Sequence, residues 1–149
     1  LTEDLKERKI VRIYWAIVER NIGQDEGVID TPITRHPVNR KRMAVIDSGS
    51  SRRAVTHFKV LERFGEYTLV ELELETGRTH QIRVHMAYIG NPIIGDTVYG
   101  SKRQKFKTNG QVLHAKRLAF TQPITGEYME LEGELPEYFI ELLEILRNQ

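Results

Sequence analysis

The chain has 149 residues, the length of one ordinary domain, and its 40% hydrophobic and 29% charged residues are typical of a globular protein. It contains no cysteine, which excludes a disulfide framework, an iron–sulfur cluster, a cysteine-based zinc site and a thiol nucleophile. No hydrophobic run approaches the ~18 residues of a membrane span, and the first residues lack the hydrophobic segment of a signal peptide. We therefore expect a cytoplasmic protein with no membrane partner.

Two-residue periodicity dominates the first half of the chain. Strands are predicted at residues 9–18, 28–33, 43–47, 53–64, 66–75, 117–121 and 127–132. The first segment is hydrophobic on both sides, which indicates a strand covered on both faces, with Arg12 and Tyr14 sharing one of them. The fourth and fifth segments form an antiparallel hairpin around Gly65. Its second strand alternates inward residues such as Leu72 with outward glutamates.

Helical periodicity predicts helices at residues 2–8, 79–89 and 137–147. Thr79 is expected to cap the second of these helices and Gly90 to end it, while Pro136 opens the third. Because mostly antiparallel strands carry packed helices, the expected fold class is α+β with a mostly antiparallel mixed sheet. No linker or internal repeat divides the chain, so residues 1–149 are expected to form a single unit.

The net charge is only +1, but basic and acidic residues are segregated along the chain. Basic side chains gather in residues 35–53 and 99–117, whereas glutamates gather in residues 62–75 and 127–144. Such segregation can give one face a strongly positive potential, which favours a polyanion such as nucleic acid as the partner. Each basic run taken alone is equally typical of a solvated loop, so the preference for nucleic acid depends on having two runs.

The junction between a predicted strand and a predicted helix at residues 74–85 has the most unusual local sequence. Gly77 permits a tight approach, Arg78 supplies a cation, and Thr79 is placed to cap the helix. Free backbone N–H groups and the helix dipole would then favour an anion at this point. The junction is therefore a candidate anion-binding site.

Arg83 lies on a small, apolar side of the same helix, near Met86 and Ala87. A buried guanidinium without a partner is costly, so we expect a carboxylate or a phosphate against it. Two interpretations stay open. Arg83 either meets its partner in an active site or forms a structural ion pair with a nearby acid such as Asp96 or Glu75.

Other common chemistries have little support in the sequence. His80 and His85 are five residues apart, which separates them by about 140° around a helix, so no metal site is expected. The chain contains no Gly-x-Ser-x-Gly motif of serine hydrolases and no glycine-rich nucleotide-binding motif.

The segment TGRTHQIRVHM, from Thr76 to Met86, resembles the signature of the RluA/RluD family of RNA pseudouridine synthases. Further segments resemble the same family in order and spacing, at residues 35–45, 54–58, 90–100 and 113–118. Together these segments extend along nearly the whole chain.

The resemblance implies a pseudouridine synthase catalytic-domain fold and isomerisation of uridine in RNA, most typically large-subunit ribosomal RNA, without a cofactor or a metal. It implies that Tyr14 stacks on a uridine base that has left the RNA stack. It also implies that Arg83 pairs with the essential aspartate of an Arg-Leu-Asp motif and keeps that carboxyl ionised. Contacts to RNA are expected from Arg35, His36, Arg40, Lys41, Arg78 and His80.

The chain departs from the family in one respect, because it contains no Arg-Leu-Asp. We expect the aspartate segment, and any S4-like RNA-binding domain, to lie before Leu1. Residues 1–149 would then be the C-terminal portion of a catalytic domain, inactive alone and monomeric when complete. Two alternatives stay open: a non-catalytic RNA-binding module and, less favoured, a protein-interaction domain that uses the acidic face.

Overall fold

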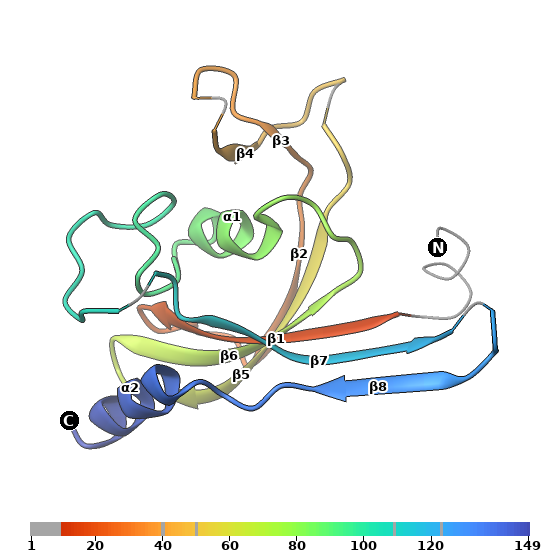
Figure 1. The fold of residues 1–149 in the computed structure, drawn as a ribbon. Helices are drawn as coiled ribbons and strands as arrows, with labels where there is room; N and C mark the ends of the chain where they lie inside the picture. Colours follow the sequence, from red (N-terminus) through yellow and green to blue (C-terminus); the bar gives the residue numbers. More distant parts are fainter. Residues whose placement is uncertain (1–9, 40, 50, 109, 123) are drawn as a thin grey trace.

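The computed structural model describes residues 10–149 except 40, 50, 109 and 123 (Figure 1). The strands are β1 (Val11–Glu19), β2 (Glu26–Asp30), β3 (Ile33–Arg35), β4 (Met43–Val45), β5 (Val55–Arg63), β6 (Tyr67–Leu74), β7 (Leu113–Thr121) and β8 (Tyr128–Glu132). The helices are α1 (Gln81–Tyr88) and α2 (Glu137–Arg147). The expected α+β class is confirmed, and the helix expected at residues 2–8 lies outside the described residues.

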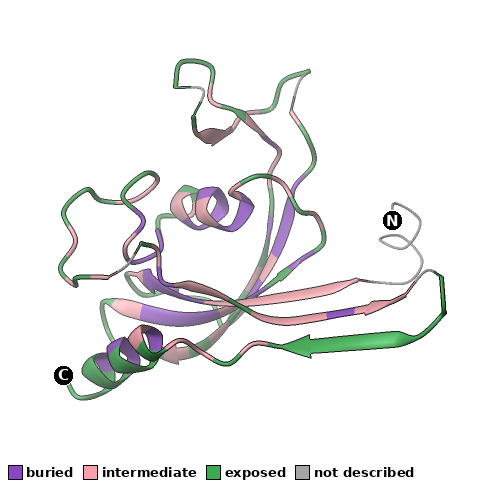
Figure 2. Cartoon of the chain, in the orientation of Figure 1, coloured by how far each residue is buried: buried purple, intermediate pink, exposed green. Residues whose placement is uncertain are grey.

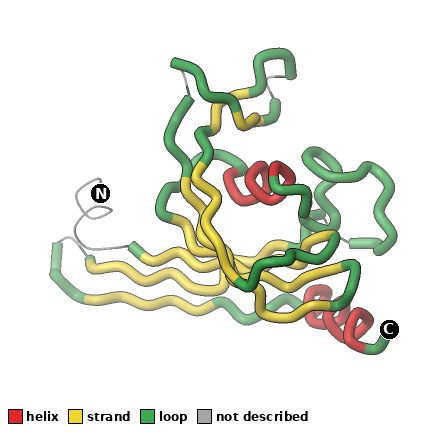
Figure 3. Tube along the Cα trace, turned by 180° about the vertical axis from the view of Figure 1, so that it is seen from behind, coloured by secondary structure: helices red, strands yellow, loops and turns green. Residues whose placement is uncertain are grey.

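Six strands form one sheet in the order β2-β5-β6-β1-β7-β8, and each neighbouring pair in it is antiparallel. Strands β3 and β4 form a separate two-stranded sheet, which we call the basic hairpin together with its connecting residues 36–42. Figures 1 and 3, seen from opposite sides, show α1 between this hairpin and the main sheet. Among the described residues, neither helix is long and apolar enough to cross a membrane.

Two hydrophobic cores cover the two faces of the main sheet, because β1 and β6 carry hydrophobic residues on both sides. The core beneath α1 buries Val70 and Leu72 of β6 against Met86 of the helix. The core on the opposite face buries Ile17 of β1 beside Phe139 of α2. The expected double coverage of β1 is therefore confirmed, and Figure 2 shows that burial is greatest near the two helices and least along β8.

Two expected strand boundaries are wrong for identifiable reasons. The segment expected as one strand over residues 28–33 is divided between β2 and β3, because Pro32 has no N–H to continue a ladder. The strand expected to begin at Arg117 begins at Leu113, because Leu113 pairs with Ala16 of β1. The earlier start brings Leu113 beside the pocket described below.

Candidate active site

The loop between β6 and α1 is fixed by the buried side chain of Gln81. Its Nε2 donates to the carbonyl of Val55 at 3.0 Å and to Oγ1 of Thr56 at 2.9 Å. Its Oε1 accepts from the hydroxyl of Thr76 at 2.7 Å and from the backbone N–H of Arg78 at 3.0 Å. Because both amide hydrogens and both oxygen lone pairs are used, this one side chain fastens the loop to β5.

Helix α1 begins two residues later than expected. Its N-cap is His80, in the left-handed conformation (φ 54°, ψ 22°), and no side chain caps the helix. The expectation that Thr79 caps it is therefore wrong, since the contacts of Gln81 impose the turn instead. The N–H of Arg78 is also already bonded to Gln81, so it is not free for the anion expected at this junction.

Arg83 of α1 and Asp96 form a bidentate ion pair. Arg83 Nε lies 2.9 Å from Oδ2 of Asp96, and Arg83 Nη2 lies 3.1 Å from Oδ1. The Asp96 side chain is fully buried and that of Arg83 is 14% exposed. The backbone N–H groups of Val98 and Tyr99 also donate to Oδ1 of Asp96, both at 3.1 Å. Of the two acids named from the sequence, Asp96 is therefore the partner of Arg83.

The ion pair keeps both groups charged. Burial alone would raise the pKa of Asp96, but hydrogen bonds from Arg83 and from the backbone of Tyr99 and Val98 hold that pKa below its ordinary value. The hydrogen bond to Asp96 raises the pKa of Arg83 in spite of burial. Arg83 Nη1 has no hydrogen-bond partner among the described residues, so the guanidinium is oriented by one carboxylate and retains donors for another group.

A pocket of about 380 Å³ brings several predicted site residues together. Its lining comprises Tyr14, Leu74, Arg78, His80, Gln81, Ile82, Arg83, Gln111 and Leu113. Tyr14 lies on β1 opposite Leu72 of β6, where the pairing of β1 with β7 shifts register. The pocket therefore combines a half-buried aromatic ring, two arginines and a histidine over a hydrophobic floor.

Arg12 lies beside the loop that leads to this pocket. A Cβ atom at Gly77 would be 2.5 Å from Nη1 of Arg12, so the absence of a side chain at position 77 makes room for this guanidinium. Arg12 Nε is buried without a hydrogen-bond partner among the described residues. The sequence placed Arg12 on the face of Tyr14, but nothing in it indicated the contact with Gly77.

Tyr99 connects the pocket to the basic hairpin. Its hydroxyl accepts the N–H of Met43 at 2.8 Å and lies 2.7 Å from Nδ1 of His80. The guanidinium carbons of Arg42 and Arg83 lie 5.0 and 5.1 Å from the centre of its ring. Neither Tyr99 nor Arg42 was identified as a site residue from the sequence, because their contacts join segments far apart in the chain.

Of the other predicted RNA-binding residues, Arg35, His36 and Lys41 do not line this pocket. Arg35 and Lys41 are exposed on the basic hairpin. Nδ1 of His36 accepts hydrogen bonds from the backbone N–H groups of Val38 and Asn39. His36 also lines a separate hollow, to which β4 and α1 contribute residues. Arg40 lies outside the described residues. The structure thus separates a pocket group, Arg78 and His80, from a hairpin group.

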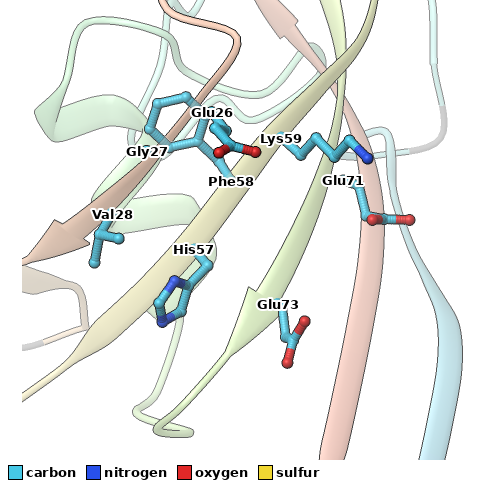
Figure 4. Close-up of a pocket in the computed structure, with 8 residues that line it drawn as sticks. All are labelled: Glu26, Gly27, Val28, His57, Phe58, Lys59, Glu71 and Glu73. Atoms are coloured by element: carbon cyan, nitrogen blue, oxygen red, sulfur yellow. The ribbon is translucent and has the colours of Figure 1, made fainter.

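The opposite face of the main sheet carries another hollow, of about 410 Å³ (Figure 4). His57 pairs with Glu73 across β5 and β6, and Lys59 pairs with Glu71. With Glu26 as a third carboxylate, the hollow has too many negative groups to suit a polyanion. Among the residues that the structure describes, no three histidine, aspartate or glutamate side chains are grouped so that they could hold a metal ion.

Comparison with known proteins identifies the class of this chain. The model of a family described as RNA pseudouridylate synthase matches residues 1–88. The chain belongs to this family.

The relatives and solved structures agree with this assignment. The chain is 52% identical over 148 residues to "Uncharacterized RNA pseudouridine synthase YlyB" of Bacillus subtilis, and 45% identical over 159 residues to "Ribosomal large subunit pseudouridine synthase D" of Pasteurella multocida. Each match covers 99% of this chain and 48% of the relative, so the chain spans about half the length of these curated relatives.

The structure of "Human RNA Pseudouridylate Synthase Domain Containing 4" superposes with a TM-score of 0.77 at 29% identity. That match covers 98% of this chain and 66% of the human one. "Human RNA Pseudouridylate Synthase Domain Containing 1" gives a TM-score of 0.75 at 26% identity, with coverage of 99% and 70%. The fold implied by the resemblance is therefore confirmed.

Proposed function

We propose that this chain forms part of an enzyme that isomerises uridine to pseudouridine in structured RNA. The observation that carries the proposal is the pocket in which Tyr14 faces the same space as Arg83, whose guanidinium is oriented by Asp96. In the reaction the bond from ribose to N1 of uracil breaks, a bond from ribose to C5 forms, the hydrogen on C5 leaves as a proton, and N1 takes up a proton. Nothing in this balance requires an oxidant or a reductant.

Tyr14 and Arg83 have distinct roles in this proposal. The ring of Tyr14 stacks on the uracil after the base has left the RNA stack. Arg83 donates through Nη1 to the family's catalytic aspartate and stabilises its ionised form. The 149 residues contain no Arg-Leu-Asp motif, so the reaction needs an aspartate from outside them. Relatives about twice as long are consistent with this requirement.

RNA contacts are divided between the pocket and the basic hairpin. Arg78 and His80 bind the nucleotide near the pocket, while Arg35, His36, Arg40 and Lys41 hold phosphates of the surrounding RNA. The name of the Pasteurella multocida relative supports large-subunit ribosomal RNA as the substrate. We further propose that the complete protein acts in the cytoplasm, where ribosomal RNA is found, as a monomer and without a metal or cofactor.

The alternative is an RNA-binding module without chemistry, and salt-sensitive RNA binding would not distinguish it. The test is release of tritium from RNA labelled at C5 of uridine, with the full-length protein and with the 149-residue chain alone. We expect release by the full-length protein and none by the chain alone. RNA binding without release by the full-length protein would establish the alternative, and turnover by the chain alone would refute the need for an outside aspartate.

A further inference from the structure

The hydroxyl of Tyr99 has two hydrogen-bond partners, and the chemistry of the first fixes the direction of one bond. The backbone N–H of Met43, 2.8 Å away, can only donate, so it occupies a lone pair of the tyrosine oxygen. The other partner is Nδ1 of His80 at 2.7 Å. The direction of this second bond depends on the tautomer of His80. Donation from the hydroxyl to Nδ1 is the direction that gives the tyrosine hydrogen a partner among the described residues.

This assignment determines the state of the His80 ring. A nitrogen that accepts the hydroxyl hydrogen carries no proton of its own, so with this bond direction His80 is neutral and its single ring proton is on Nε2. Nε2 has no partner among the described residues. Since His80 lines the pocket with Tyr14 and Arg83, Nε2 is the ring atom available to a molecule bound there.

The surrounding charges favour the same state. Burial, and then the positive charge of Arg83, lower the pKa of His80, while Asp96 acts in the opposite direction. Arg42 lies over the ring of Tyr99 and adds a further positive charge on the hairpin side, and Arg78 lines the same pocket. The backbone of His80 has φ 54°, in the left-handed region, which is energetically unfavourable for a residue other than glycine. The neighbouring contacts maintain this conformation.

We propose that Tyr99 is a positioning residue that holds His80 as a neutral Nε2–H donor to an acceptor oxygen of the RNA nucleotide in the pocket. The ligand oxygen is either a carbonyl of the base or an oxygen of the sugar–phosphate backbone, both of which accept one hydrogen bond. The proposal rests on the proposed function for the identity of the ligand. The state of the His80 ring does not depend on that function.

Heteronuclear NMR of the histidine ring nitrogens tests the ring state in the full-length protein without RNA. The His80 signals are assigned by their loss in His80→Gln. At neutral pH we expect Nδ1 without a proton and Nε2 with one. In Tyr99→Phe we expect the His80 pKa to rise, because the neutral form loses its hydrogen bond. A protonated Nδ1 in the unmodified protein, or identical His80 titrations in both proteins, would overturn the proposal.

Tyr88→Phe is the matched control, because Tyr88 is exposed on α1 and its hydroxyl has no hydrogen bond to the described residues. It should leave the His80 titration unchanged. If Tyr99→Phe fails to fold, the protonation of Nδ1 in the unmodified protein still decides the question. A correct ring state in a protein that releases no tritium would refute the enzymatic function and leave the positioning role intact.

RNA binding tests the donor itself. His80→Ala should weaken binding, and His80→Gln, which keeps an N–H donor, should restore part of the loss. Because the donor is neutral, neither variant should change the slope of affinity with salt concentration. The comparison is repeated with RNA whose target nucleotide lacks its base. If the loss in His80→Ala disappears there, the acceptor is a base carbonyl, and if it persists, the acceptor is in the backbone. No loss with either RNA would refute the donor role.

Discussion

Arg83 of α1 donates hydrogen bonds to both carboxylate oxygens of Asp96, at 2.9 and 3.1 Å, and Asp96 lies in the segment that follows α1. Asp96 is tied in turn to the backbone N–H groups of Val98 and Tyr99. The guanidinium is therefore placed by a buried carboxylate that does not line the pocket. Asp96 therefore acts on the pocket only through Arg83. Its contribution to stability can be measured separately from catalysis.

Asp96→Asn should destabilise the protein by about 3 kcal/mol, since breaking a buried ion pair leaves an uncompensated charge. Urea unfolding followed by circular dichroism measures the change. Glu62→Gln is the control, because it breaks the solvent-exposed pair with Arg147 and should cost little. Equal losses in the two variants would contradict a special contribution of the buried pair.

The Asp96 pair should also contribute a specific acid dependence. Because the folded-state pKa of Asp96 lies below its ordinary value of 3.8, the stabilisation is present above that value and is lost as pH falls through the lower folded-state pKa. The free energy of unfolding measured from neutral pH downwards should therefore fall more steeply in the unmodified protein than in Asp96→Asn. Parallel curves would show that Asp96 has no depressed pKa.

His85 should give a second pH effect, at higher pH. It is buried between Thr56 and the carbonyl of Thr31, and burial lowers its pKa from the ordinary value of 6.5. A lowered folded-state pKa means that the unfolded chain binds the proton first, so stability declines as pH falls below about 6.5. His85→Gln should reduce the difference in unfolding free energy between pH 7.5 and 5.5, both being ~1 unit from that value. An undiminished difference would contradict this contribution.

We expect Arg12, whose guanidinium lies beside the loop that leads to the pocket, to contact RNA, so Gly77→Ala should reduce RNA affinity while leaving the fold intact. The added Cβ would displace the guanidinium of Arg12, which is the flexible end of a side chain, so the effect should stay below about tenfold, or 1.4 kcal/mol. Titration of labelled RNA measures it. Gly23→Ala is the control, because a Cβ there meets nothing within 4 Å. If both variants bind RNA like the unmodified protein, Arg12 has no part in binding.

The sequence predicted those features of the fold and the site that depend on local pattern. The alternation in β6 correctly placed Leu72 in the core, and Pro136 correctly marked the start of α2. The apolar surroundings of Arg83 predicted a carboxylate or a phosphate as its partner, and the ion pair with Asp96 corresponds to the structural interpretation that the sequence left open.

The features that the sequence did not predict depend on contacts between distant segments. Gln81 bonds to Val55 and Thr56 on β5, and Tyr99 bonds to Met43 on the basic hairpin. Hydrogen bonds between distant segments leave no periodic pattern in the sequence. The cap expected at Thr79 failed for the same reason, because the contacts of Gln81 with β5 fix the turn before α1.

The most direct test compares Arg83→Lys with Lys41→Ala in the full-length protein, measuring single-turnover tritium release and RNA affinity for each. Lysine keeps the charge of Arg83 but cannot hold Asp96 and a second carboxylate together, so turnover should fall about 100-fold or more with affinity changed less than about tenfold. Lys41→Ala should instead weaken RNA binding and lower the salt slope by about 1, with turnover of bound RNA preserved. If Arg83→Lys loses only affinity and turns over bound RNA at the unmodified rate, Arg83 is not part of the catalytic pocket.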